Sequence, residues 1–154
     1  MTALECCAGI DRRRFVALSI GSTIAAPFSV MLAACATLAT RMVVPVNGVL
    51  TLPLAEHPEL RQPGGVLRLL PEGATEPVYV LVQEARHYVA LSPVCTHLGC
   101  TVDVQGGRLV CPCHGSTYDR EGRVLRGPAE RPLARYETQL TEDDRLVINL
   151  GVRK

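Results

Sequence analysis

The sequence predicts an all-β fold for residues 49–154, an antiparallel β-sandwich, preceded by an N-terminal hydrophobic segment. From Val43 onward, short apolar or alternating runs are separated by turn residues, and no stretch keeps a helical period. The pairs Gly106-Gly107 and Glu121-Gly122 suit tight turns between antiparallel strands. Many short strands joined in this way are typical of a β-sandwich or barrel.

Eight strands are expected in this domain. They are predicted, in chain order, over residues 49–54, 66–70, 78–83, 87–91, 108–110, 123–125, 135–139 and 145–150. Both phenylalanines of the chain lie in the N-terminal segment, so the core of the domain must consist mainly of valine and leucine. A small core of this kind gains from additional cross-links.

The first 41 residues are interpreted as an export signal or a membrane anchor. Residues 1–14 form a basic leader in which Arg12 and Arg13 precede Phe15 in the manner of a twin-arginine signal. Residues 15–41 form a hydrophobic segment without a charged side chain until its last residue, and at about 1.5 Å per helical residue it is long enough to span a bilayer. The leading arginines predict a cytosolic N-terminus and an exported domain.

Three fates of the hydrophobic segment remain open. It can stay as an anchor, or it can be removed as a simple signal. It can also be cut before Cys35, because Leu-Ala-Ala-Cys at 32–35 resembles a lipobox, and Cys35 would then carry lipid. Its many alanine, serine and threonine residues are more typical of a signal than of a permanent span. Residues 42–48 are a possible hinge before the domain.

Two short boxes rich in cysteine and histidine lie between predicted strands: C-T-H-L-G-C over 95–100 and C-P-C-H-G-S over 111–116. The candidate ligands in them are Cys95, His97, Cys111 and His114. Two thiolates and two imidazoles can hold one two-iron cluster. A zinc ion is the alternative, since the same residues offer a tetrahedral Cys₂His₂ set. Zinc, however, leaves Cys100 and Cys113 without a role.

Both boxes resemble those of the Rieske family almost letter for letter, and the resemblance continues through Tyr118 to a Gly-Pro-Ala sequence at 127–129. It implies a Rieske-type sandwich with the cluster-binding loops at one end, and one [2Fe–2S] cluster per chain. The first cysteine of each box would bind the inner iron, and the histidine of each box would bind the outer iron, near solvent. A Cys100–Cys113 disulfide is implied as well, and it requires an oxidising compartment.

The resemblance also implies roles for residues around the ligands. The hydroxyls of Ser116 and Tyr118 would donate hydrogen bonds to a cluster sulfide and a ligand sulfur and so raise the reduction potential. His114 would accept a hydrogen bond from quinol. Leu98 would shield the cluster and touch the electron donor, although a buried structural leucine is an equal alternative. The two histidines outside the boxes are expected on the surface.

The leading functional hypothesis is the Rieske subunit of a quinol:cytochrome c oxidoreductase. This subunit takes one electron from quinol at cytochrome b and passes it to a c-type cytochrome. The main alternative is the small Rieske subunit of an exported molybdenum oxidase that is similar to arsenite oxidase. A soluble Rieske ferredoxin and a zinc module are less favoured, because the export signal and the second cysteine pair speak against them.

Charge and motifs exclude other classes. Residues 36–154 carry 13 basic and 13 acidic side chains, which does not favour a nucleic-acid partner. No nucleotide loop, catalytic triad or carboxylate pair is present, so no turnover by the chain alone is expected. The predicted location is the bacterial cytoplasmic membrane, with the cluster domain on the periplasmic face and attachment through the N-terminal segment or a lipid.

Overall fold

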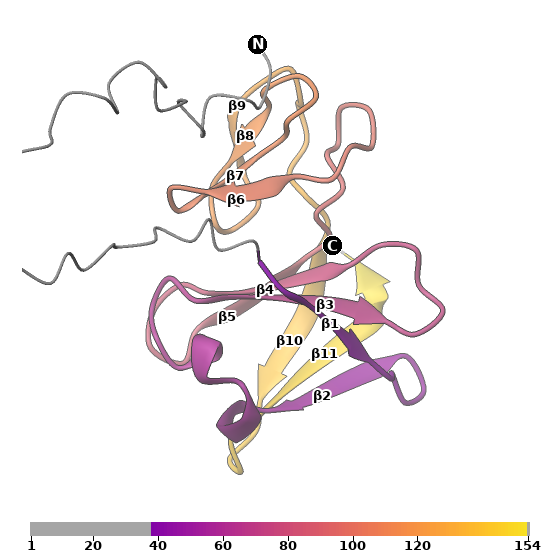
Figure 1. The fold of residues 1–154 in the computed structure, drawn as a ribbon, viewed down its shortest axis with the longest axis vertical. Helices are drawn as coiled ribbons and strands as arrows, with labels where there is room; N and C mark the ends of the chain where they lie inside the picture. Colours follow the sequence, from indigo (N-terminus) through magenta and orange to yellow (C-terminus); the bar gives the residue numbers. More distant parts are fainter. Residues whose placement is uncertain (1–37, 154) are drawn as a thin grey trace, which may run out of the picture. The chain divides into compact units, whose positions relative to one another are not determined.

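The computed structural model describes residues 38–153, and these residues form two β-sheets (Figure 1). The larger sheet has the strand order β1-β3-β4-β5-β10-β11-β2, and the smaller sheet has the order β6-β7-β8-β9. Among the described residues there is no α-helix, only two 3₁₀ helices, η2 (Leu54–Glu56) and η3 (Pro58–Leu60). None of these residues belongs to a helix that could cross a membrane. The predicted all-β fold is confirmed.

All eight predicted strands are present, with ends that differ by a few residues. The larger sheet contains β1 (Thr40–Val43), β2 (Val49–Pro53), β3 (Val66–Pro71), β4 (Val78–Val82), β5 (Tyr88–Leu91), β10 (Arg135–Leu140) and β11 (Arg145–Arg153). The smaller sheet contains β6 (Asp103–Gln105), β7 (Arg108–Val110), β8 (Thr117–Tyr118) and β9 (Val124–Arg126). The sequence did not predict β1, β6 and β8. Neighbouring strands are antiparallel except for β1 and β3, which are parallel.

Strands β4 and β5 are buried on both faces, and this double burial positions the smaller sheet. Val80 of β4 lies in the core of the larger sheet, whereas Tyr79 and Leu81 lie in a second core together with residues of the smaller sheet. The Tyr79 hydroxyl donates a hydrogen bond of 2.9 Å to the Val102 carbonyl, just before β6. Because water reaches neither face, both strands are apolar throughout instead of alternating.

The smaller sheet is an insertion between two neighbouring strands of the larger one. Leu91 at the end of β5 is paired with Arg135 at the start of β10, and the chain between them forms all of β6 to β9. The chain therefore leaves and re-enters the larger sheet at one place. Both cysteine- and histidine-containing boxes belong to this insertion.

The start of the domain differs from the prediction. Thr40 and Arg41, which the sequence placed in the hydrophobic segment, lie in β1 and pair with β3. An edge strand accommodates the charge of Arg41 because its guanidinium can reach the Glu59 carboxylate, 3.3 Å away. The segment that could serve as a membrane span therefore ends at residue 39 at the latest. The export signal at Arg12 and Arg13 and the lipidation candidate Cys35 lie outside the described residues.

The predicted hinge at 42–48 consists of the end of a strand, a short connection and a turn. Its first two residues belong to β1, and Val46 and Val49 exchange two backbone hydrogen bonds of 2.9 Å each. Asn47 and Gly48 between them have φ angles of 51° and 75°. Positive φ at both central residues is the requirement of a tight hairpin turn, which Asn-Gly satisfies. The structure thus shows a strand and a turn where the sequence suggested a hinge.

Candidate metal centre

The two boxes adopt nearly the same backbone conformation. In box one, the Gly99 amide donates to the Cys95 carbonyl at 2.9 Å, and in box two the Gly115 amide donates to the Cys111 carbonyl at 3.0 Å. The two glycines have φ angles of 82° and 74°, which residues with a side chain rarely adopt. Glycine is therefore required at the fifth position of each box because of this backbone conformation. Lack of space is not the reason, since an added Cβ would meet no neighbouring atom at either position.

Each box presents its thiol inward and its imidazole outward. Cys95 and Cys111 are free cysteines and are 2% and 1% exposed. His97 and His114 are exposed, and their rings meet edge to face with centroids 4.9 Å apart. The fold therefore brings together the four candidate ligands that the sequence predicted, with sulfur on the buried side and nitrogen on the solvent side.

The remaining two cysteines of the boxes are bonded to each other. Cys100 and Cys113 form a disulfide with Cα atoms 6.5 Å apart, as the resemblance implied. Their sulfurs and that of Cys111 lie within 4.8 Å of one another. These three atoms are not a metal site, because a disulfide sulfur is not a thiolate. The bond ties the two loops together beside the free thiols.

The Tyr118 hydroxyl lies 3.2 Å from the Cys95 sulfur. It accepts a hydrogen bond from the Thr96 amide, also at 3.2 Å, so its own proton is available for donation. The Thr96 hydroxyl is 3.2 Å from that of Tyr118, but it donates to the Arg131 carbonyl at 2.6 Å. The Tyr118 proton therefore goes to Cys95 or Thr96. Thr96 was not selected from the sequence, in which its only distinction is its place between two candidate ligands.

Ser116 connects box two to the Gly-Pro-Ala loop. Its side chain is completely buried, and its hydroxyl accepts a hydrogen bond of 3.0 Å from the amide of Ala129. An accepting hydroxyl keeps its proton for a further partner. The peptide bond between Gly127 and Pro128 in this loop is cis. The loop is therefore fastened directly next to the thiols.

The local environment shifts the pKa values of the two thiols in opposite directions. Burial on its own raises the pKa of Cys95, but hydrogen bonds from Tyr118, the His97 amide and neighbouring groups outweigh it, so the pKa is lowered. Burial raises the pKa of Cys111, and the adjacent Cys95 sulfur adds to this increase. Burial first, and the bond to Cys95 second, raise the pKa of Tyr118. Tyr118 therefore acts as a proton donor, and Cys95 ionises before Cys111.

Burial decides the predictions for Leu98 and for the two histidines outside the boxes. Leu98 is 69% exposed, so the alternative that it is a buried core residue is wrong. His57 was expected on the surface, but it is only 7% exposed. It follows η2, where its ring is covered and its Nδ1 lies 3.8 Å from the Glu59 carboxylate. His87 is exposed, as expected.

The donor set fits a two-iron cluster. Two buried thiols can supply thiolate ligands, and two adjacent imidazoles can supply nitrogen ligands, one kind for each iron. The hydroxyl directed at the Cys95 sulfur also suits a centre that gains negative charge on reduction. The disulfide gives the second cysteine pair the role that a zinc site does not explain.

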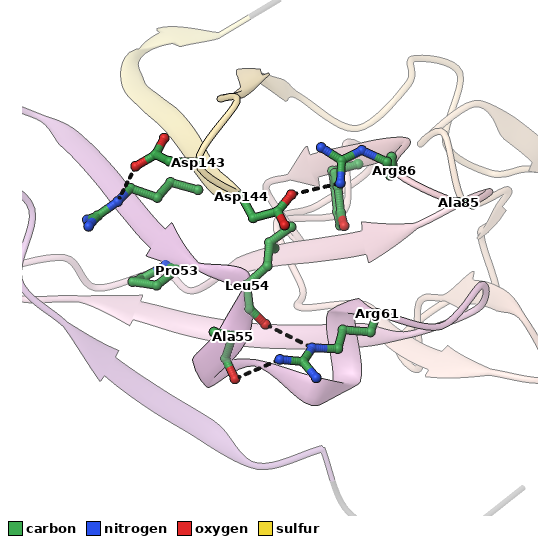
Figure 2. A pocket seen from close by; sticks show the side chains of 10 residues that line it. Pro53, Leu54, Ala55, Arg61, Ala85, Arg86, Asp143 and Asp144 are labelled. Carbon is green, nitrogen blue, oxygen red and sulfur yellow. Dashed lines mark hydrogen bonds and ion pairs between the residues drawn. The ribbon is translucent and has the colours of Figure 1, made fainter.

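A pocket of about 350 Å³ lies elsewhere in the domain and is lined by no box residue (Figure 2). Arg86 and Asp144 are paired across it at 2.7 Å, and Arg145 is paired with Asp143 at 2.8 Å. Arg61 donates to two backbone carbonyls. The charged groups of this pocket are thus already engaged with one another or with the backbone, so it offers no free charge for a ligand.

Comparison with known proteins agrees with this geometry. The profile of the Rieske [2Fe-2S] domain matches residues 53–137, more than half of the chain. Over 77 residues the chain is 51% identical to the cytochrome b6-f complex iron-sulfur subunit of Synechococcus elongatus, covering 47% of this chain and 42% of that protein. Over 87 residues it is 41% identical to cytochrome b6-f complex iron-sulfur subunit 2 of Synechocystis sp., covering 53% and 48%. The chain spans about half the length of the curated relatives it matches.

A solved structure also resembles this domain. A chain in the complex of reduced oxygenase and oxidized ferredoxin in carbazole 1,9a-dioxygenase covers 71% of this chain and 98% of its own length, with a TM-score of 0.52 and 24% identity. At this identity the likeness shows the fold alone. The profile match, which includes both boxes, shows more: this chain belongs to the Rieske [2Fe–2S] domain family, whose members bind a [2Fe–2S] cluster.

Proposed function

We propose that this protein transfers single electrons through its Rieske cluster, accepting one from quinol at a cytochrome b and passing it to a c-type cytochrome. The observation that carries the proposal is the layering of the donor set, with buried thiols behind two exposed imidazole rings. This layering presents the imidazole side of the centre to a partner. The relatives that are iron-sulfur subunits of the cytochrome b6-f complex support the same role.

The cysteines and histidines of the two boxes have different roles in holding the cluster. Cys95 and Cys111 would hold the inner iron as thiolates, and His97 and His114 would hold the outer iron, each through one ring nitrogen. The bound cluster supplies a reversible one-electron couple whose potential is raised by its nitrogen ligands. Tyr118 stabilises the charge on the Cys95 sulfur by hydrogen bonding.

The exposed tip of the boxes is the proposed quinol contact. The outward-facing ring of His114 accepts a hydrogen bond from the quinol hydroxyl when its second nitrogen, the one not bound to iron, carries no proton. Leu98, next to His97 and 69% exposed, offers an apolar surface to the same partner. Large exposed apolar side chains near a reactive group commonly mark a site that is covered by a ligand or another protein.

The proposed place of action is the bacterial cytoplasmic membrane, with the cluster domain on the periplasmic face. The arginine pair Arg12-Arg13 would direct export, and the segment 15–39 or a lipid on Cys35 would provide attachment. The disulfide is consistent with an oxidising compartment. As a subunit that only carries electrons, the chain has no turnover alone.

Isolated native membranes provide the test. Anaerobic addition of a reduced quinol should produce the paramagnetic resonance signal of a reduced Rieske cluster, and added oxidised cytochrome c should remove it. Cytochrome b should co-purify with the chain. A cluster that quinol leaves oxidised, in a chain that co-purifies with a large molybdopterin protein and is reduced by arsenite, would instead establish the molybdenum-oxidase alternative.

A further inference from the structure

The segment from β1 to the Asn-Gly turn exposes apolar side chains in a regular pattern. Met42, Val44 and Val46 are 67%, 71% and 69% exposed. They alternate with Val43, which packs against the core of the larger sheet. Residues at every second position of an extended segment point to one side. These three side chains therefore form one outward-facing row, called here the apolar stripe.

Apart from Arg41, which is paired with Glu59 at 3.3 Å, no charged residue adjoins the stripe along the chain. Residues 42–55, which comprise the second half of β1, the Asn-Gly turn and all of β2, contain no charged side chain. The strand β1 is at one end of the larger sheet and pairs only with β3. Natural proteins usually protect such an edge with charge, because an exposed apolar edge strand is prone to aggregation. A covering surface is therefore required.

The position of the stripe in the chain indicates what covers it. The part of the uncharged run from Phe15 that lies before β1 ends at residue 39, three positions before Met42. At about 3.3 Å per extended residue, the stripe begins within about 10 Å of the end of that run. If the attachment is a lipid on Cys35, the stripe begins within about 25 Å of it. Either attachment holds the stripe beside the same bilayer.

We propose that the apolar stripe lies in the interfacial layer of the membrane and fixes one edge of the cluster domain to the lipid surface. The proposal rests on the membrane attachment that we proposed above, but it does not depend on the electron-transfer partners. Because residues 42–55 are uncharged, the contact is apolar and does not require anionic lipids. A groove of about 300 Å³ between β1 and β2 borders the stripe.

The chain contains no tryptophan, so a single introduced tryptophan can report on the depth of the stripe. The experiment uses the full chain with its cluster, reconstituted in vesicles of phosphatidylethanolamine and phosphatidylglycerol with or without brominated acyl chains. Val44→Trp places the probe in the stripe. Leu125→Trp is the matched control, because Leu125 is 53% exposed but lies next to Val124 in β9 of the other sheet.

We expect brominated lipids to quench the emission of Val44→Trp strongly and that of Leu125→Trp little, at low and high salt alike. Equal quenching of the two variants in vesicle-bound protein would overturn the proposal. A Val44→Trp probe that is shielded in detergent by a second copy of the chain, with a doubled mass on size-exclusion chromatography, would also overturn it. Protein that does not bind vesicles at all would show that the membrane attachment fails. Quinol oxidation can be intact or lost in each case, so the two proposals are tested separately.

Discussion

The hydroxyl of Tyr118 is directed at a ligand sulfur, and its removal should change the reduction potential. A hydrogen bond to a charged group is worth about 1.5–3 kcal/mol. For a one-electron couple, about 1.4 kcal/mol corresponds to roughly 59 mV. Tyr118→Phe should therefore lower the potential by roughly 60–130 mV in protein-film voltammetry, because the reduced state loses this donor.

The control for this variant is Tyr79→Phe. Tyr79 belongs to the same buried core as Tyr118, but its hydroxyl donates to the Val102 carbonyl and not to a cysteine sulfur. Its removal should reduce stability and leave the potential unchanged. Equal potentials in the wild type and in Tyr118→Phe would mean that the hydroxyl does not act on the cluster.

Ser116→Ala should affect both stability and potential. The variant leaves the amide of Ala129 buried without its acceptor, and an unsatisfied buried donor costs about 1–3 kcal/mol. The Ser116 hydroxyl also lowers the pKa of the Cys95 thiol, so its loss should lower the potential as in Tyr118→Phe. Urea unfolding followed by visible absorption of the cluster measures the first effect. An unchanged unfolding midpoint would argue against the Ala129 bond.

Among single residues, the candidate ligands could be chosen from the sequence because the two boxes share one local geometry. Gly99 and Gly115 close the two loops with matching hydrogen bonds, so the spacing within each box determines where its thiol and imidazole lie. Thr96 was missed, because its role depends on contacts with Tyr118 and the backbone of Arg131, which are distant in sequence. The burial of His57 was likewise a matter of tertiary packing.

Among the loops, the disulfide is the element whose loss should matter most. Replacing both partners, in the double variant Cys100→Ser with Cys113→Ser, avoids a new reactive thiol. Closing a ring of about 15 residues is worth roughly 3 kcal/mol of chain entropy. We expect a larger practical effect, because the freed loops admit water and oxidants to the cluster. The rate of cluster bleaching in air should rise, and an unchanged rate would show that the loops are held by other contacts.

Gly122 tests how tightly the second core is packed. Its φ angle is 85°, and an added Cβ would lie 3.2 Å from Leu91 and 3.3 Å from Leu133. Gly107 has a similar φ of 78° with open space around it. Both alanine variants should lose about 1–2 kcal/mol for the left-handed backbone, but Gly122→Ala should lose about 1–3 kcal/mol more through overpacking. Thermal unfolding compares them, and equal losses would exclude crowding at Gly122.

The strands that the sequence did not predict share a physical reason. β6 and β8 have three and two residues, too few to establish a period, and they are strands because β7 lies next to both. β1 follows directly on an uncharged run, so its residues could not be distinguished from that run by hydrophobicity. By contrast, β4 and β5 were predicted because complete burial makes them continuously apolar.

For the molecule as a whole, the two separate cores predict a divided response to loss of the cluster. The ligands lie in the second core and its loops, whereas the core of the larger sheet contains none of them. Removal of iron with a chelator should therefore abolish amide-exchange protection in β6 to β9 and preserve it in β2, β3, β10 and β11. Hydrogen exchange with mass spectrometry measures this. A uniform loss of protection would mean that the two sheets unfold as one unit.

The insertion between β5 and β10 also has a consequence for synthesis on the ribosome. The strands up to β5 emerge first, and at that stage Leu81 and Leu91, with the rest of their face, have no covering layer. The three hairpins that follow are local contacts, which form quickly and at little entropic cost. β10 can then pair with β5 across a loop that the hairpins have already compacted. A nascent chain arrested after β5 is thus the stage at which this protein most needs a chaperone.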